Sequence, residues 1–219
     1  MARKREESMQ DVPLAVSAVT GDTIEKAFLA DSTALAQFAP NVVFDKVEAG
    51  TPSGGAFSIR GISYQDVEKG FDPTVLLTID GIAIGTGTAN VMNLLDIESI
   101  EILRGPQGTL FGKNAVGGII NVRRKKPEFD ATFGKLRATA GNYGTNNVEG
   151  FVNLGGETTA LKVNASRYDH DGYWDNITTG REDGERTEGT LDADFRWQPT
   201  DTLDIRLKGG YADVSGTAN

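Results

Sequence analysis

The sequence has no cysteine and a single histidine, His170. The absence of cysteine excludes disulfide bonds and thiol chemistry. One histidine cannot form a histidine cluster around a metal, and the sequence offers no Ser-His-acid arrangement. We interpret His170 as a solvated side chain at the end of a strand. The sequence therefore predicts no catalytic residue, no metal ligand and no cofactor, and we expect a protein that is not an enzyme.

Long apolar runs and an excess of positive charge are also lacking. No stretch approaches the roughly 18 consecutive apolar residues of a membrane-spanning helix, and the mean hydropathy is −0.30. The formal net charge is −9. Nucleic acid is therefore not expected as a partner, because neutralising phosphates requires a basic surface. Residues 1–5 and 123–126 are locally basic, and solvated segments or a linker account for both.

The most informative stretch runs from Ile100 to Val122. It begins and ends with β-branched segments, Ile100–Leu103 and Ile119–Val122, which predict two strands. Between them, five glycines and a proline predict repeated tight turns around one short apolar pair, Leu110 and Phe111. The chain is expected to leave a sheet, form a compact loop and return to the sheet.

The pair Gly112-Lys113 resembles the end of a phosphate-binding loop. The spacing argues against this interpretation, because Gln107 occupies the position of the required glycine and Asn114 that of the required hydroxyl residue. A turn-rich connector inside a small sheet is the better hypothesis.

The same stretch is similar, almost residue for residue, to a signature of the plug domain in TonB-dependent outer-membrane receptors. Two upstream elements resemble further motifs of that family, in the family's order: Phe57-Ser58-Ile59-Arg60-Gly61 is similar to "fSIRG", and Thr78-Ile79-Asp80-Gly81-Ile82 to "vDGv". The residues that carry the plug signature are Gly105, Pro106, Gln107, Gly108, Phe111, Gly112, Gly117, Gly118 and Asn121.

Residues 12–126 are predicted to form this plug as a small α+β domain, a mixed sheet with short helices. A helix is expected to begin at Thr20-Gly21-Asp22, and a second at Asp31-Ser32 that Pro40-Asn41 ends. Asp80-Gly81 predicts the turn of a hairpin over 75–84, since both residues suit positive φ. Further strands are expected at 14–19, 42–44 and 56–60, with one or two helical turns at 90–95.

Residues 127–219 show a different pattern. Apolar and polar residues alternate with a period of two in five segments, at 133–140, 147–154, 161–166, 190–197 and 203–208. This pattern predicts strands with one apolar and one polar face, a signal that average hydropathy misses. An ordinary β-sandwich would also alternate.

The connectors favour an antiparallel β-meander that forms the start of a transmembrane β-barrel. The segments 155–159 and 198–201 are short, whereas 171–185 is long and acidic, which is the asymmetry of periplasmic turns and extracellular loops. Four aromatic residues are predicted near strand ends, where interfacial rings would lie: Tyr168, Tyr173, Trp174 and Trp197. The acidic residues Asp169, Asp171, Glu182, Asp183 and Glu185 suggest a charged external loop, with weak cation attraction as the alternative.

The resemblance implies energised uptake of a scarce ligand, such as a ferric siderophore, cobalamin or a glycan, across the outer membrane. It implies an inner-membrane TonB-type partner, contact with outer-membrane lipid and an extracellular small ligand. Residues 1–11 resemble the segment that follows the family's coupling box. We expect the chain to lack that box and a signal peptide, and to hold only the first five or so strands of an incomplete barrel.

The resemblance also implies two sets of site residues. Apical plug loops are expected to contact the ligand, with plain solvent-exposed turns as the alternative: Thr51, Ser53, Gly54, Gly55, Ala56, Gly85, Thr86, Gly87 and Thr88. Arg60 and Arg104 match the family's two motif arginines, which pair with acidic groups on the barrel wall. Those acids are expected beyond Asn219, and a buried arginine without its partner would destabilise the fragment.

Other function classes remain as alternatives. The chain could be a stand-alone periplasmic plug-like binding module without transport activity, in which case truncation after Lys126 would change nothing. A hydrolase would need a nucleophile-base pair that the sequence does not offer. A passive porin conflicts with a plug ahead of the strands, because porin lumens are left as aqueous channels.

Overall fold

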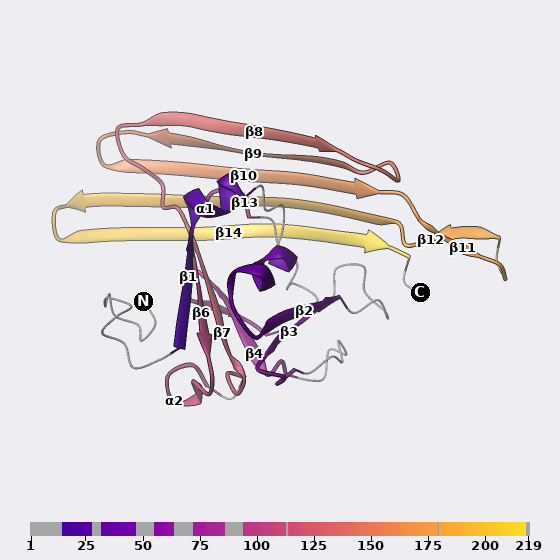
Figure 1. The fold of residues 1–219 in the computed structure, drawn as a ribbon. Helices are drawn as coiled ribbons and strands as arrows, with labels where there is room; N and C mark the ends of the chain where they lie inside the picture. Colours follow the sequence, from indigo (N-terminus) through magenta and orange to yellow (C-terminus); the bar gives the residue numbers. More distant parts are fainter. Residues whose placement is uncertain are drawn as a thin grey trace. The chain divides into compact units, whose positions relative to one another are not determined.

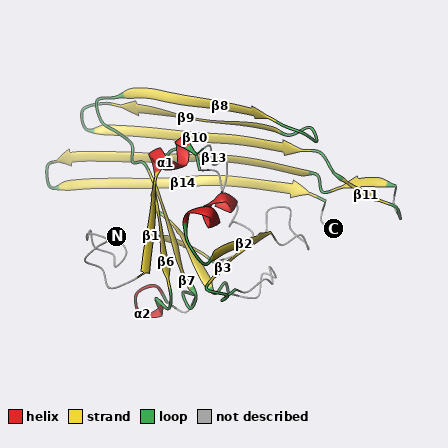
Figure 2. Ribbon diagram, in the orientation of Figure 1, coloured by secondary structure: helices red, strands yellow, loops and turns green. Residues whose placement is uncertain are grey.

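The computed structural model describes residues 15–27, 32–46, 55–63, 72–85, 94–112, 114–178 and 180–217. The chain divides into two compact units, Met1–Lys125 and Lys126–Asn219, drawn from indigo to yellow along the sequence in Figure 1. The boundary expected after residue 126 lies one residue beyond this division. Strands predominate over short helices in the described residues (Figure 2).

The first unit is built on a five-stranded sheet in the order β1-β6-β7-β4-β5. Its strands are β1 (Ala15–Thr20), β4 (Val75–Ile79), β5 (Ile82–Ile84), β6 (Ile97–Arg104) and β7 (Gly118–Arg124). β4 and β7 are parallel, and the other neighbours are antiparallel. A separate antiparallel pair consists of β2 (Val42–Lys46) and β3 (Gly55–Ile59). The predicted α+β class with a small mixed sheet is confirmed.

Apolar clusters pack against both faces of this sheet. Successive residues of a strand point to opposite faces, and successive residues of β7 belong to different clusters. On β7, Ile120 and Val122 pack in the larger cluster and Ile119 in the smaller one, and all three are fully buried. Ile24 and Leu35 bring the two short helices into the larger cluster. Apolar residues at successive positions, such as Ile119 and Ile120, are typical of strands buried on both faces.

The helices begin where the sequence predicts. Thr20 caps α1 (Gly21–Lys26), and its hydroxyl accepts a hydrogen bond from the backbone N–H of Thr23 at 3.3 Å. A Cβ at Gly21 would overlap the carbonyl oxygen of Ile97, so the close approach of α1 to β6 requires glycine. The second helix, η2 (Ser32–Phe38), takes the tighter 3₁₀ form.

The predicted hairpin at Asp80-Gly81 is confirmed. Asp80 has φ 52° and Gly81 φ 85°, and they join the antiparallel strands β4 and β5. Positive φ at both central residues is what a tight hairpin turn requires.

Several expected boundaries in this unit are wrong. β3 begins at Gly55, one residue before the expected strand, because it pairs with β2 from that residue. Gly55 and Ala56 are therefore buried in a strand, and their assignment to an apical loop is wrong. Arg60 follows β3 in a turn with φ 56°. Leu94 and Leu95 are not helical, and the rest of the helical turn expected at 90–95 lies outside the described residues.

The second unit is an antiparallel meander in the order β14-β13-β10-β9-β8, and Figure 1 shows its long strands side by side. The strands are β8 (Thr132–Ala140), β9 (Asn146–Gly155), β10 (Thr159–His170), β13 (Arg186–Thr200) and β14 (Leu203–Gly216). All five predicted strands are confirmed. They are longer than predicted, because pairing continues through polar ends that show no apolar period.

The connection 171–185 is not a plain loop. It contains a short hairpin of β11 (Trp174–Asn176) and β12 (Arg181–Asp183). At its base, the Tyr173 N–H donates to the Asp183 carbonyl at 3.0 Å. The next turn is also shorter than expected, since β13 runs to Thr200 and β14 begins at Leu203.

The register of the meander separates two faces, since directly opposed residues share a face. Its apolar face carries Leu136, Val148, Val152, Leu154, Leu161, Val163, Leu191, Phe195, Trp197, Ile205, Leu207 and Tyr211. Its polar face carries Arg137, Glu149, Asn153, Lys162, Asp194, Arg196, Arg206 and Lys208. Leu136 is 75% exposed and Lys162 only 1%. This order of burial is the reverse of that in water-soluble domains.

The same register tests the predicted interfacial aromatics. Trp197 lies on the apolar face, opposite Ile205. Tyr168 lies on the polar face, opposite Asn147 and Glu188, so its assignment to an interfacial belt is wrong.

Among the described residues, no helix is long and apolar enough to cross a membrane.

Candidate functional site

The glycine-rich signature forms a loop closed by backbone hydrogen bonds. The Gly105 N–H donates to the Gly117 carbonyl at 2.9 Å, and the Gln107 N–H to the Ala115 carbonyl at 2.8 Å. Within the loop, the short helix α2 (Gly108–Phe111) includes Phe111 of the expected apolar pair. The predicted compact loop between two strands is confirmed, and its helical turn is an addition that the turn pattern did not reveal.

Three signature glycines hold backbone conformations that other residues avoid. Gly105, Gly112 and Gly118 have φ of 110°, 89° and 154°. A Cβ at Gly118 would in addition overlap the carbonyl oxygen of Leu103 on the neighbouring strand. The return of the loop into β7 therefore depends on glycine at this position.

The signature's Asn121 links three strands by side-chain hydrogen bonds. The Thr78 hydroxyl donates to Asn121 Oδ1 at 2.9 Å, and Asn121 Nδ2 donates to Glu101 Oε2 at 3.1 Å. Thr78 is buried, and a buried polar side chain is tolerated when it is hydrogen-bonded. The parallel pair β4–β7 and the antiparallel pair β6–β7 thus share one polar bridge.

Asp80 of the hairpin turn holds the end of β7. Its Oδ1 accepts a hydrogen bond from the Arg124 N–H at 2.9 Å, and its Oδ2 pairs with Arg124 Nε at 3.0 Å. The carboxylate is only 9% exposed. Hydrogen bonds to a charged, largely buried acceptor are among the stronger ones in proteins.

We expect Asp80→Ala to lower the free energy of unfolding of the first unit by about 2 kcal/mol, since it removes both bonds to Arg124 and leaves alanine at a positive φ. Asp80→Asn is the matched control, because asparagine tolerates this φ and keeps an acceptor for the Arg124 N–H. It should retain at least half of the lost stability in urea denaturation. Equal losses for the two variants would show that the hydrogen bonds contribute little.

The two motif arginines lie differently. Arg104, at the end of β6, donates from Nε to the Ala15 carbonyl and from Nη1 to the Pro40 carbonyl, both at 3.4 Å. Arg60 is exposed in its turn, and its guanidinium lies near Gly105. Their pairing with acids on a barrel wall stays a prediction.

Most of the expected ligand-contacting loops lie outside the described residues: Thr51, Ser53, Gly54, Thr86, Gly87 and Thr88. Gly55 and Ala56 are core positions, and a Cβ at Gly55 would overlap the ring of Phe44. Gly85 follows β5 and is exposed. Of the three expected contacts that the structure describes, Gly85 is the exposed one, and its contact with a ligand stays a prediction.

The polar face of the meander carries a charge network that the sequence interpretation did not identify. Asp194 pairs with Arg206 Nε at 2.9 Å and with Lys208 Nζ at 3.4 Å, and Arg137 pairs with Glu149. These pairs join neighbouring strands at directly opposed or adjacent positions. The sequence signal for these pairs is that oppositely charged residues occupy the polar positions of neighbouring predicted strands.

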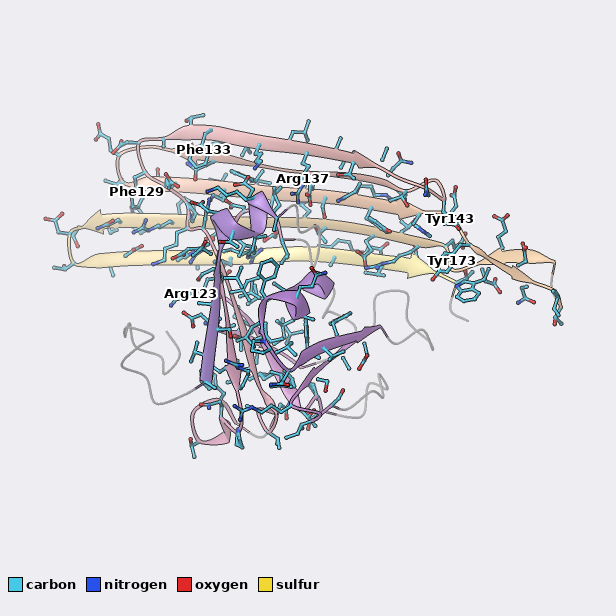
Figure 3. The ribbon with its side chains drawn as sticks, in the orientation of Figure 1. Arg123, Phe129, Phe133, Arg137, Tyr143 and Tyr173 are labelled. Carbon is cyan, nitrogen blue, oxygen red and sulfur yellow. The ribbon has the colours of Figure 1, made fainter. Side chains whose placement is uncertain are left out.

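Two aromatic rings, Phe133 and Phe151, complete this face, and Figure 3 labels Phe133 toward one end of the strands and Arg137 nearer their middle. Phe133 and Phe151 meet edge to face at 6.0 Å, and the Lys162 ammonium lies 5.9 and 5.3 Å from their centroids. Cation–π contact offsets part of the cost of burying this lysine. Within the described residues, no group of three or more histidine, aspartate or glutamate side chains is arranged to hold a metal.

The comparisons with known proteins bear directly on the first unit. A family model described as the TonB-dependent Receptor Plug Domain matches residues 8–119, half of the chain. The chain belongs to the TonB-dependent receptor plug family. The resemblance inferred from the signature is confirmed, and with it a location in the bacterial outer membrane and membership of a family of receptors and not of enzymes.

The chain is also similar in sequence to individual receptors of the family. The chain is 44% identical over 71 residues to the pesticin receptor of Yersinia pestis, covering 32% of this chain and 10% of the receptor. It is 29% identical over 132 residues to the ferrioxamine receptor of Yersinia enterocolitica, covering 59% of this chain and 18% of the receptor.

Among solved structures, the ferric yersiniabactin uptake receptor FyuA of Yersinia pestis superposes with a TM-score of 0.82 over 96% of this chain, at 24% identity. At that identity the likeness shows the fold, a plug followed by strands. The chain spans 33% of FyuA and at most a fifth of the two curated receptors.

Proposed function

We propose that the chain is the N-terminal part of an outer-membrane TonB-dependent receptor for energised uptake of a ferric siderophore. The observation that carries the proposal is the order of the two units. A plug-family domain at 8–119 is followed at once by a meander whose exposed face is apolar. A plug has a transport role only inside a barrel, and the meander supplies strands of the required pattern.

The apolar face supports a membrane location for these strands. Leu136, Leu191 and Leu207 are each more than half exposed, on a face shared by five neighbouring strands. In water a continuous apolar surface of this kind promotes aggregation, whereas lipid chains solvate it. A stand-alone periplasmic module would have to keep this surface in water and is therefore disfavoured.

The names of the similar proteins support iron as the cargo. The curated relative from Yersinia enterocolitica is a ferrioxamine receptor, and FyuA takes up ferric yersiniabactin. Cobalamin and glycans are the competing ligand classes. The proposal includes a TonB-type energy-transducing partner, and it includes pairing of Arg60 and Arg104 with acidic groups on the barrel wall.

The test is deletion of the gene in its host, followed by uptake measurements with radioactive iron on siderophores and with labelled cobalamin. We expect iron uptake from at least one siderophore to be lost, cobalamin uptake to persist, and the intact gene to restore the loss. A second deletion, of the TonB-type protein, should abolish the restored uptake. Unchanged uptake of every iron chelate with loss of cobalamin uptake would reassign the ligand, and no loss of any uptake would refute transport.

A further inference from the structure

One end of the meander carries a cluster of five aromatic rings that no described role uses. It consists of Tyr143, Tyr168, His170, Tyr173 and Trp174, here named the ring cluster. The His170 centroid lies 6.0 Å from Tyr143, 6.4 Å from Tyr168 and 5.5 Å from Tyr173, and Tyr173 lies 5.3 Å from Trp174. Figure 3 labels Tyr143 and Tyr173 at the same end of the strands.

The cluster is open to solvent. Tyr143 is 61% exposed, Tyr173 49% and Trp174 47%. Rings that served only to bury one another would be largely covered, since aromatic side chains contribute to stability through the area they remove from water. Roughly half or more of each of these three residues is instead available to another molecule.

The backbone holds Tyr143 in an unfavourable conformation. Tyr143 has φ 54° and Gly144 φ 60°, and the Thr145 N–H donates to the Asn142 carbonyl at 3.2 Å, which makes a tight β8–β9 turn. Asparagine or glycine would occupy the first position at lower cost, because a bulky side chain rarely adopts positive φ. The Asp171 N–H donates to the Tyr143 carbonyl at 2.9 Å and fixes the turn against the β10–β11 connection.

The other side of the cluster is fixed as well. The Gly184 N–H donates to Thr217 Oγ1 at 2.9 Å, so the base of the β11–β12 hairpin is bound to the end of β14. A Cβ at Gly184 would lie 3.0 Å from the Trp174 ring and 3.2 Å from the Tyr173 ring, which shows how closely both rings pack over this glycine. Segments far apart in sequence thus hold three exposed rings in place, and preorganisation of this kind favours binding.

The charge around the rings selects the chemistry of the partner. Between residues 167 and 188 the chain has seven carboxylates and three arginines. One arginine, Arg186, already lies over the Tyr168 ring at 5.3 Å. Ring faces attract cations, and the surrounding negative charge attracts cations and repels anions.

We propose that the ring cluster binds an organic cation, an alkylammonium group of an extracellular ligand. The exposed faces of Tyr143, Tyr173 and Trp174 would contact the cation, and the carboxylates of 169–185 would raise its local concentration. The inference rests on the proposed function only in placing this end of the meander outside the cell. Binding itself is a property of the cluster.

The experiment is an NMR titration of the receptor, produced from its own gene without a histidine tag and purified in detergent. His170 lies at the centre of the cluster, and its imidazole signals are identified as those that disappear in His170→Gln. The probes are choline and the neutral alcohol dimethylbutanol, in which carbon replaces the charged nitrogen. We expect choline to shift the His170 signals saturably and dimethylbutanol to bind at least fivefold more weakly.

Two variants at position 143 distinguish the contribution of the aromatic ring to binding from that of the turn conformation. Tyr143→Asn removes the ring and suits the turn, so the fold should persist while choline binding weakens about fivefold. Tyr143→Phe keeps the ring and should bind as the unmodified receptor does. Equal affinity for the two probes, or equal affinity of the two variants, would overturn the proposal.

The outcome is independent of transport. Loss of iron uptake on gene deletion together with an unshifted His170 signal would refute only the cation site. A shifted signal with no uptake defect would refute only the transport function.

Discussion

Replacing Gly118 with alanine should lower the free energy of unfolding of the Met1–Lys125 unit by about 4 kcal/mol. Gly118 has φ 154°, and a Cβ there would overlap the Leu103 carbonyl oxygen, with the Ile59 side chain also in close contact. The atoms that would have to move belong to the backbone of β6, where Leu103 pairs with Ile119 in the middle of the sheet. Losses of this size arise from strain or overpacking in a core that cannot relax.

Hydrogen exchange read by mass spectrometry measures this loss unit by unit. Amides of β6 and β7 should exchange far faster in Gly118→Ala, while those of β9 and β10 should not change. Gly108→Ala is the matched control, since Gly108 lies in the same loop with no atom within 4 Å of a Cβ and no positive φ. It should change stability by no more than about 0.5 kcal/mol. Similar behaviour of the two variants would contradict the described path of the loop into β7.

The sequence predicts those features of the fold that depend on local residue patterns. The Asp80-Gly81 turn follows from two residues that accept positive φ, and the five long strands follow from a period of two. The parallel pairing of β4 with β7 is different. It joins segments about 40 residues apart, and no local signal specifies which distant strand completes a sheet.

The errors have two physical origins. β11 and β12 are rich in polar and acidic residues, so propensity argues for a loop, and only pairing between the two segments makes them strands. Gly55 belongs to β3 because its missing side chain leaves room for the Phe44 ring of the paired strand, a contact that a glycine-rich sequence does not indicate.

In the candidate site, too, the sequence identifies some residues and leaves their contacts to the structure. The resemblance identifies Gly118 and Asn121, but the reasons for these residues are contacts with β6 and β4 that only the structure provides. The orientation of Tyr168 could have been predicted from the sequence. Tyr168 shares its parity along the strand with Lys162 and Asn164, which places it on the polar face and outside any lipid-facing belt.

Replacing Leu191 with arginine should have the second large effect, a loss of about 3 kcal/mol in the folding free energy of the receptor in lipid vesicles. Leu191 lies near the middle of β13 on the apolar face, opposite Ala165 and Tyr211, and is 55% exposed. If the apolar face meets lipid, the guanidinium would enter the hydrocarbon region, where a lipid-facing arginine is most costly. Urea unfolding in vesicles, with the amount of receptor in the outer membrane of the host as a second readout, measures the effect.

The adjacent residue provides the control, because neighbours on a strand point to opposite faces. Thr190→Arg adds the same charge to the polar face, where Thr190 is exposed and shares a hydrogen bond with the Ser166 hydroxyl at 2.6 Å. It should lower stability by no more than about 1 kcal/mol. Equal tolerance of both arginines would mean that water covers both faces, and the membrane location of the meander would have to be abandoned. A loss confined to Leu191→Arg would tie the apolar face to lipid through the register alone, since the two variants differ by one step along the same strand.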